Sequence, residues 1–194
     1  MNISFHPASE TYLQTFSSSA IVLFKILRNI ALFVLVALIG IYGSVRGHPL
    51  KATIVAFMLF VTHIAGVEHP LEEASVIIIA GFIGALVELV NAMASLYSFH
   101  NVVQFISVLP TWIVFTWFAI GATARHSFSW LTNKPLIAAV TGVGLGLLVY
   151  HTAATVGAIS LIHTDMYYLF LVAAPWAIAF PLTVLIGERF FETE

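Results

Sequence analysis

The sequence predicts an all-α fold: a polytopic integral membrane helix bundle with six transmembrane helices. Of its 194 residues, 60% are hydrophobic and only 8% are charged, a composition that is unusual for a soluble domain. The apolar segments are too many for one small core, and several approach the about 20 residues that a helix needs to cross hydrocarbon. They lack the alternation of lipid-facing and lumen-facing residues that barrel strands show, which favours helices.

Six spans are expected in chain order, with Pro or Gly marking most of the connections between them. They are Ile21–Tyr42, Ala52–Val67, Ser75–Leu96, Pro110–Arg125, Leu136–Ala158 and Tyr167–Ile186. The second span is short, so a re-entrant hairpin is the alternative there. No small-residue cleavage pattern follows the first span, which we interpret as resembling a signal anchor. The chain divides into a polar N-terminal segment (1–20), a single transmembrane helical domain (21–190) and a C-terminal tail (191–194).

Basic residues gather on one side of the predicted bundle. Six crossings place most of them on the side of both termini: Lys25, Arg28, Arg125, Lys134 and Arg189. Arg46 and Lys51 lie on the opposite side. Because cytoplasmic loops carry the excess of Lys and Arg, both termini are expected in the cytoplasm. The chain has no cysteine, and no basic cluster suggests a nucleic-acid partner.

Glu88 is the most informative residue, because it interrupts the long apolar third span. Small and polar residues recur at three- and four-residue steps along one face of this helix: Gly81, Gly84, Glu88, Asn91 and Ser95. An acid at the centre of a span costs about 2.5–3.5 kcal/mol on insertion scales, so it needs a partner, protonation or nearby water. We expect Glu88 to be catalytic; the alternative is a protonated residue that packs against another helix.

The fifth span offers a partner for Glu88. At about 1.5 Å of rise per residue, His151 lies at a depth comparable to that of Glu88, and an imidazole beside a carboxylate can titrate near neutral pH. We therefore expect a catalytic pair of Glu88 and His151, with Asn91, Tyr150 and Thr155 lining the same substrate pocket. The alternative for His151 is an interfacial or hydrogen-bonded histidine.

Glycines on the fifth span indicate close packing. Gly142 and Gly146 form a small-xxx-small step, which is typical of helices whose backbones approach each other in a membrane. We expect another helix to pack there, and room for a lipid-like substrate is the alternative.

The fourth span adds the remaining expected substrate-binding residues. Trp112, Thr116 and His126 share one helical face, and Arg125 stands near the cytoplasmic boundary. Arg125 is expected either to anchor lipid headgroups or to pair with an acid of the segment 68–73.

The segment 68–73 is the densest acidic patch of the chain. With a nearby histidine it raises a metal hypothesis, since imidazole and carboxylate are ordinary metal ligands. The candidate ligands are His63, Glu68, His69, Glu72 and Glu73. The histidine boxes of membrane di-iron enzymes need many more correctly spaced histidines. The sequence therefore favours a solvated loop, and we assign neither a metal ligand nor a cofactor.

Two motifs of the chain resemble those of a known family. They are Leu109–Phe118 (LPTWIVFTWF) and Thr123–Leu131 (TARHSFSWL). Both look like the signature of a small bacterial inner-membrane protein family of unknown function, often encoded beside cyclopropane-fatty-acid-synthase-like and other lipid-modifying proteins. The resemblance covers roughly Ile26 to Glu188. It implies a bacterial cytoplasmic (inner) membrane location, with the lipid bilayer and lipid-modifying enzymes as partners.

Three functions stay open at this point. The first is an enzyme or accessory factor of membrane-lipid modification with an intramembrane polar pocket. The alternatives are a small proton-coupled transporter that titrates Glu88 and a non-catalytic scaffold for lipid enzymes. A second similarity links Pro70–Glu73 to an acidic motif of small membrane lycopene cyclases, in which carboxylates deliver protons to a polyene.

Overall fold

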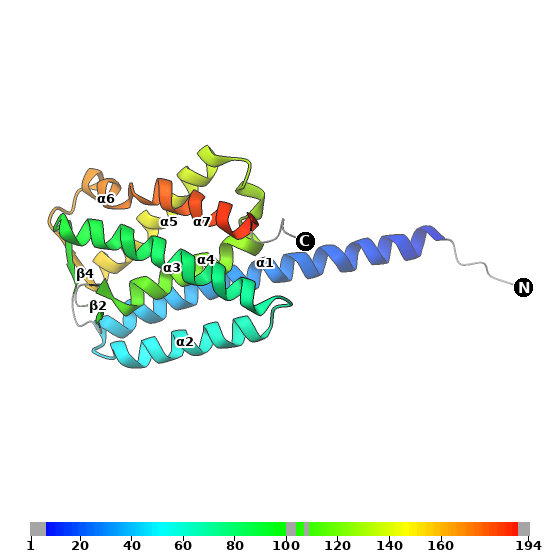
Figure 1. The fold of residues 1–194 in the computed structure, drawn as a ribbon, viewed down its shortest axis with the longest axis horizontal. Helices are drawn as coiled ribbons and strands as arrows, with labels where there is room; N and C mark the ends of the chain where they lie inside the picture. The colour runs from blue at the N-terminus through cyan, green and yellow to red at the C-terminus, as the bar shows by residue number, and fades with distance from the viewer. Residues whose placement is uncertain (1–6, 100–103, 107–108, 190–194) are drawn as a thin grey trace, which may run out of the picture.

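The computed structural model of the chain describes residues 7–99, 104–106 and 109–189. Its helices lie side by side along one axis (Figure 1). They are α1 (Pro7–Val45), α2 (Pro49–Ala65), α3 (Pro70–Met93), α4 (Thr111–Ser127), the 3-10 helix η1 (Ser129–Leu131), α5 (Pro135–Thr155), α6 (Met166–Ala173) and α7 (Trp176–Arg189). The prediction of an all-α fold is confirmed.

Prolines set several of the helix boundaries. Pro49, Pro70 and Pro135 occupy the first turns of α2, α3 and α5, where a residue without an N–H leaves no intrahelical hydrogen bond unmade. Pro175 separates α6 from α7, so the sixth expected span consists of two helices rather than one. At the start of α6, the side chain of Asp165 accepts a hydrogen bond from the backbone N–H of Tyr168 at 2.9 Å.

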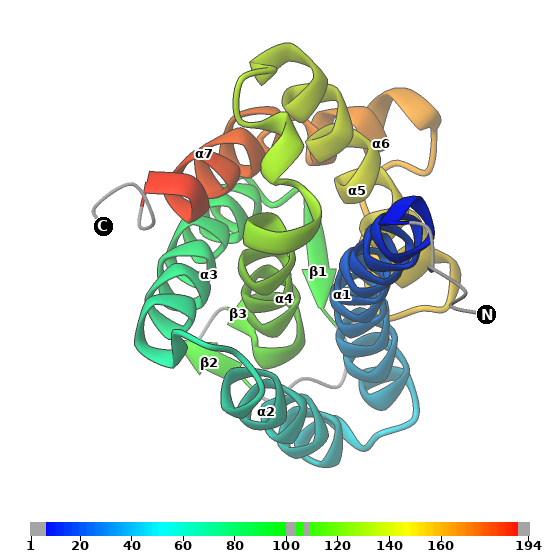
Figure 2. The ribbon, with the colours of Figure 1, turned by 90° about the vertical axis from the view of Figure 1, so that its right-hand side faces the viewer.

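Helix α4 lies in the middle of the bundle. In the view along the bundle, α1, α2, α3 and α7 surround it (Figure 2), and each of these helices contacts it. Nearly all of its residues are buried, including the large side chains of Trp112, Trp117 and Ile120. A helix that is apolar on all sides is suited to such a central position.

Four helical segments are long and apolar enough to cross a membrane. They are Ala20–Val45, Pro70–Met93, Pro135–Thr155 and Met166–Arg189. Helices α2 and α4 have 17 residues each, so six crossings and the placement of both termini stay predictions. Helix α2 is continuous along its length, unlike a re-entrant hairpin.

Large apolar side chains cover the outside of the bundle. Examples are Phe24, Phe57, Phe82, Leu86, Met93, Val140 and Ile178. A soluble monomer rarely exposes so many large apolar side chains, whereas contact with lipid hydrocarbon makes their exposure favourable. The surface and the four long segments together indicate a membrane protein.

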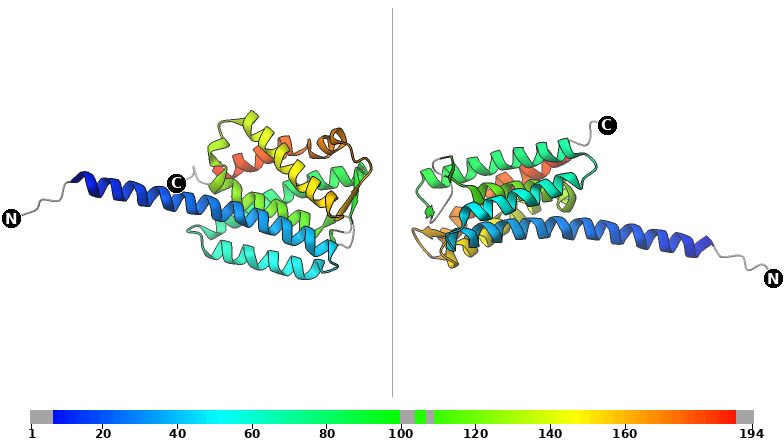
Figure 3. Two further views of the ribbon diagram at one scale, coloured as in Figure 1. Left: turned by 180° about the vertical axis from the view of Figure 1, so that it is seen from behind. Right: turned by 90° about the horizontal axis from the view of Figure 1, so that it is seen from below.

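Helix α1 continues beyond the bundle at its N-terminal end (Figures 1 and 3). It begins at Pro7, so residues 7–19 belong to the same helix as the first expected span. The expected tail 191–194 lies outside the described residues.

Short strands close the opposite end of the bundle, and the sequence did not predict them. Strand β1 (Tyr97–Phe99) pairs antiparallel with β4 (Ile159–Leu161), and β2 (Gln104–Ile106) pairs with β3 (Leu109–Pro110). The first pair ties the connection after α3 to the connection after α5. It thereby holds Tyr97 over the inner face of α3.

Candidate functional site

Glu88 is fully enclosed by three hydrogen-bond donors. Its side chain is 0% exposed, on the inner face of α3. Oε1 accepts hydrogen bonds from the hydroxyl of Tyr150 at 2.8 Å and from Nε1 of Trp117 at 3.0 Å. The hydroxyl of Tyr97 donates to Oε2. Both oxygens therefore have partners, drawn from α4, α5 and β1.

Ser95 brings Tyr97 back toward Glu88. It has φ 54°, a left-handed conformation at the end of α3, and the next amide, of Leu96, donates to the carbonyl of Asn91 at 3.0 Å. Such a residue commonly ends a helix and reverses the chain. Ser95 is exposed, so it does not share the buried face expected for it.

Burial and the neighbouring Glu88 raise the pKa of Tyr97 above its ordinary value, so Tyr97 keeps the proton that it donates.

A second layer of hydrogen bonds surrounds Tyr150. Its hydroxyl accepts from Nε1 of Trp176 at 3.1 Å and from Nδ2 of Asn91 at 3.3 Å. Asn91 also donates to the carbonyl of Val172 at 3.1 Å. Glu88, Asn91, Tyr97, Trp117, Tyr150 and Trp176 form a set that we call the Glu88 cluster. It joins α3, α4, α5 and α7 at the centre of the bundle.

The expected pair of Glu88 and His151 is wrong. His151 is exposed, and the neighbouring Tyr150 takes the position beside Glu88. Consecutive residues of an α-helix point about 100° apart. Tyr150 and His151 therefore lie at nearly the same depth, but only one of them faces the inside of the bundle. Thr155 is also exposed, whereas the expected pocket residues Asn91 and Tyr150 do contact each other.

Trp112 and Thr116 of α4 are buried, but they lie outside the Glu88 cluster. The hydroxyl of Thr116 donates to the carbonyl of Trp112 at 2.9 Å. A Cβ added at Gly40 of α1 would lie 2.6 Å from Cβ of Trp112, so this side of α4 packs closely on α1. The structure brings neither residue to Glu88.

A second polar cluster lies at the end of the bundle where α2 leads into α3. His63 is in the last turn of α2, Glu73 in the first turn of α3 and His126 in the last turn of α4. Acidic groups are favoured at helix N-termini and basic groups at C-termini. Because α3 begins at the end of the bundle where α2 and α4 end, complementary groups gather there at one level.

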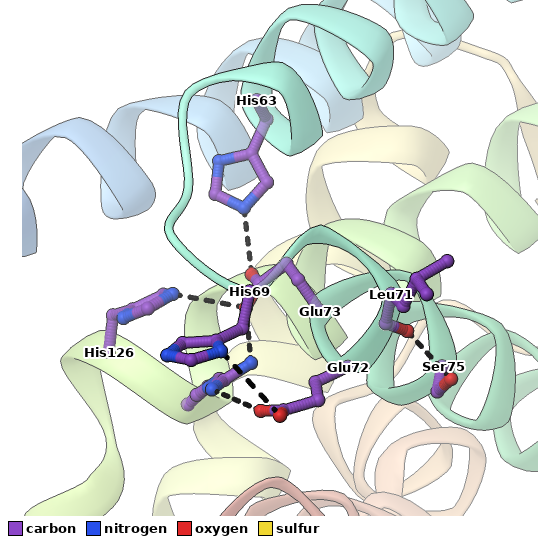
Figure 4. Close-up of polar contacts among 8 residues, drawn as sticks. His63, His69, Leu71, Glu72, Glu73, Ser75 and His126 are labelled. Atoms are coloured by element: carbon purple, nitrogen blue, oxygen red, sulfur yellow. Dashed lines mark hydrogen bonds and ion pairs between the residues drawn. The ribbon is translucent and has the colours of Figure 1, made fainter.

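Glu73 is the centre of this cluster (Figure 4). Nε2 of His63 lies 2.8 Å from its Oε1, and Nε2 of His126 lies 3.1 Å from its Oε2. Nη1 of Arg125 donates to Oε2 of Glu73 at 3.3 Å, while Nη2 donates to Glu72 at 2.9 Å. The predicted pairing of Arg125 with an acid of segment 68–73 is confirmed.

The interpretation of the acidic segment as a solvated loop is wrong for Glu73, and the candidate ligand His63, which precedes the segment, is buried as well. Glu73 is 1% exposed and His63 is 8% exposed, because both lie on helices that pack against α4. Glu68 and His69 are exposed, between α2 and α3. The sequence did not reveal that His126, 53 residues after Glu73, completes the cluster.

A cavity of about 440 Å³ opens beside this cluster, and we call it the bundle-end pocket. Its lining residues are Lys25, Arg28, Gly66, Val67, Glu68, His69, Glu73, Arg125, His126, Ser129, Gly187 and Glu188. Among the described residues it therefore presents three Lys or Arg side chains and three Glu side chains. The sequence signal for it was the accumulation of Lys and Arg on one side of the predicted bundle.

The cluster also offers a set of metal ligands. One ligand atom each from His63, Glu73 and His126 lie within 4.8 Å of one another. Two imidazoles and a carboxylate are a donor set that zinc and iron accept in proteins. Glu73 and His126 line the bundle-end pocket, so such a centre would adjoin the cavity.

A protein-family model matches residues 26–182, and its description is "Protein of unknown function (DUF2878)". The matched range contains the Glu88 cluster and the three residues His63, Glu73 and His126. Lys25, Gly187 and Glu188 of the pocket lie outside it. No curated protein and no solved structure matches the chain.

Proposed function

The chain belongs to DUF2878, an uncharacterised protein family, and from its own residues we propose an integral membrane enzyme that binds and modifies the headgroup of a membrane lipid. The observation that carries this proposal is the bundle-end pocket, in which one cavity joins Lys25, Arg28 and Arg125 to the pair of Glu73 and His126. Cations that can hold a phosphate thus face groups that can transfer a proton or bind a metal.

The depth of the pocket supports a headgroup rather than an acyl chain as the reacting group. Its residues come from the connection between α2 and α3, the first turn of α3, the last turns of α4 and α7 and the start of η1, together with Lys25 and Arg28 of α1. Ends of spanning helices lie where hydrocarbon meets water, and the headgroups lie at the same level. A polar cavity there is positioned for a headgroup.

The charges of the pocket support a zwitterionic headgroup. Lys25 and Arg28 suit a phosphate, which Arg in particular binds through two parallel N–H groups. Arg125, whose terminal nitrogens bind Glu72 and Glu73, adds positive charge beside them. Glu68 and Glu188 carry the opposite charge and suit an amine. A volume of about 440 Å³ also falls within the range of small-molecule pockets. A phosphoethanolamine-type headgroup has the required phosphate and amine.

The proposed topology has six crossings with both termini in the cytoplasm, in the inner membrane of a bacterium. Arg46 and Lys51 lie at the end of the bundle opposite the pocket, which leaves the basic excess on the pocket side. The pocket would then take lipids from the cytoplasmic leaflet. Lipid-modifying enzymes that supply or consume its product are the partners we propose.

The transporter alternative has less support. A proton carrier must exchange its proton with water on each side in turn. Glu88 is 0% exposed, and its oxygens accept from Tyr97, Trp117 and Tyr150. This enclosure favours a structural role in which Glu88 joins helices. A scaffold without activity of its own is the interpretation if His126→Gln restores the lipid profile in the test below.

Lipid mass spectrometry tests the proposal. Membranes are compared from cells that have the gene, lack it, or carry His126→Gln or the control His48→Gln. His48 is exposed at the opposite end of the bundle. We expect one headgroup class to change on deletion, with recovery by wild type and His48→Gln but not by His126→Gln. An unchanged profile on deletion, or full recovery by His126→Gln, would overturn the proposal.

A further inference from the structure

We infer that His63, Glu73 and His126 bind a divalent transition-metal cation, with zinc as the best-suited ion, in the wall of the bundle-end pocket. The three residues come from three different helices, at chain positions separated by 10 and 53 residues. The inference rests on the proposed function in one respect: the ion would serve the headgroup chemistry of that pocket. Binding of the ion itself is measurable without a lipid.

The geometry of the donor atoms supports an ion between them. Nε2 of His63 lies 2.8 Å from Oε1 of Glu73, and Nε2 of His126 lies 3.1 Å from Oε2. Both imidazoles therefore address the same carboxylate, one at each oxygen, and all three ligand atoms lie within 4.8 Å of one another. Zinc–ligand bonds of about 2.0–2.2 Å require only small movements of side chains that already converge.

Burial also favours an ion over three solvated side chains. His63 is 8% exposed and Glu73 is 1% exposed. An ion that binds to these ligand atoms would therefore displace little water from them. His126 is partly exposed and lines the cavity. A centre with three protein ligands and one side toward a cavity has the form of a catalytic rather than a structural zinc site.

The surrounding charges tolerate a cation. Glu72 and Glu73 carry two negative charges, and Arg125, which binds both, carries one positive charge. The other charged side chains of the pocket balance one another, Lys25 and Arg28 against Glu68 and Glu188, so the Lys, Arg and Glu side chains together keep one negative formal charge. Arg125 also fixes Glu73 from the side away from His63, because it donates to Oε2 whereas His63 contacts Oε1. Such fixation of a ligand by a neighbouring group strengthens metal sites.

The ligand types select the class of ion. Imidazole suits zinc, iron, copper and nickel, whereas magnesium and calcium prefer sites made of oxygen ligands. Two of the three proposed ligands are nitrogen atoms. We therefore expect zinc or cobalt to bind and magnesium to bind weakly.

The test uses the full-length protein, purified in detergent and stripped with a chelator. Zinc is then titrated calorimetrically, elemental analysis gives the number of ions per chain, and cobalt supplies a visible absorption band for nitrogen and oxygen ligation. We expect one zinc ion per chain and a rise in Tm on binding. Loss of a neighbour that orients a metal ligand weakens sites about 10–100-fold, so we expect at least that loss from His126→Gln and from His63→Gln.

His48→Gln is the matched control and should bind zinc as wild type does, since His48 is exposed at the other end of the bundle. Gel filtration and Tm without metal show which variants fold. If one histidine variant fails to fold, the other and the wild-type stoichiometry decide the question. No zinc on the wild-type chain, or unchanged affinity in a folded His126→Gln or His63→Gln variant, overturns the inference.

The two proposals fail separately. One bound zinc in a protein whose deletion leaves every lipid unchanged would keep the metal site and remove the lipid function. A changed lipid class together with a metal-free, active protein would do the reverse.

Discussion

Tyr150 on α5 donates a hydrogen bond to Glu88 on α3 at 2.8 Å, across 62 residues of chain. The same hydroxyl accepts from Trp176 on α7 and Asn91 on α3. One tyrosine hydroxyl thus connects α3, α5 and α7, and the carboxyl group to which it donates has no contact with solvent. This relationship makes the Glu88 cluster a structural junction between helices, and the bundle-end pocket is the place that we propose for chemistry.

Glu88→Gln should destabilise the protein. The amide has one oxygen acceptor instead of two, so at least one of the donors Tyr97, Trp117 and Tyr150 loses its partner inside the bundle. A buried donor without a partner costs about 1–3 kcal/mol. Thermal unfolding in detergent measures the change, with exposed Glu68→Gln as the control for stability. An unchanged Tm in Glu88→Gln would contradict the structural role.

The helices themselves followed from the sequence, whereas their rotation did not. Apolar runs of nearly membrane-spanning length and prolines such as Pro49 and Pro135 predict where helices lie. The depth along the helix axis predicted that His151 lies beside Glu88. The side chain that contacts Glu88 belongs instead to the preceding residue, Tyr150. Strands of two or three residues leave too little pattern to detect.

The bundle-end cluster could be predicted only in part. The ion pair between Arg125 and an acid of segment 68–73 could be predicted, because the two have opposite charges and lie on the same side of the predicted bundle. The structure contains this ion pair. The contact of His63 and His126 with one carboxylate depends on how three helix ends pack together. Such long-range packing leaves no spacing motif in the sequence.

Glycines on α5 offer a matched pair of stability tests. A Cβ at Gly142 would lie 2.4 Å from the carbonyl oxygen of Trp176, whereas a Cβ at Gly144 meets nothing within 4 Å. We expect Gly142→Ala to cost about 1–3 kcal/mol through overpacking. Gly144→Ala should instead stabilise by about 0.5–1 kcal/mol, because Ala favours the helix interior. Equal Tm values for the two variants would show that α5 and α7 do not pack as described.

Ser95 tests the turn that positions Tyr97. Its positive φ of 54° costs little for Gly but about 1–2 kcal/mol for residues with a Cβ. Ser95→Gly should therefore raise Tm, and Ser95→Val should lower it, because a β-branched side chain is more strained in this conformation. The reverse order of the two Tm values would argue against the left-handed turn.

Arg125→Gln should weaken both stability and activity. The Arg125 side chain is 6% exposed and binds Glu72 and Glu73, so its removal leaves buried Glu73 with only its contacts to His63 and His126. Breaking a buried ion pair costs about 3–5 kcal/mol when the charge is left unpaired, and the two histidine contacts make the expected cost smaller than that. The double variant Arg125→Gln with Glu72→Gln should recover part of the Tm, since it removes one of the two carboxylates. A double variant no more stable than Arg125→Gln alone would contradict this electrostatic explanation.

The most direct measurement of the central claim is lipid binding by the purified protein, followed by native mass spectrometry. Phosphatidylethanolamine and phosphatidylglycerol are offered to wild type, Arg28→Gln in the pocket and Arg46→Gln at the opposite end. We predict that wild type and Arg46→Gln retain one phosphatidylethanolamine in preference to phosphatidylglycerol, and that Arg28→Gln retains less. Equal retention of both lipids by all three proteins would contradict a headgroup site in the bundle-end pocket.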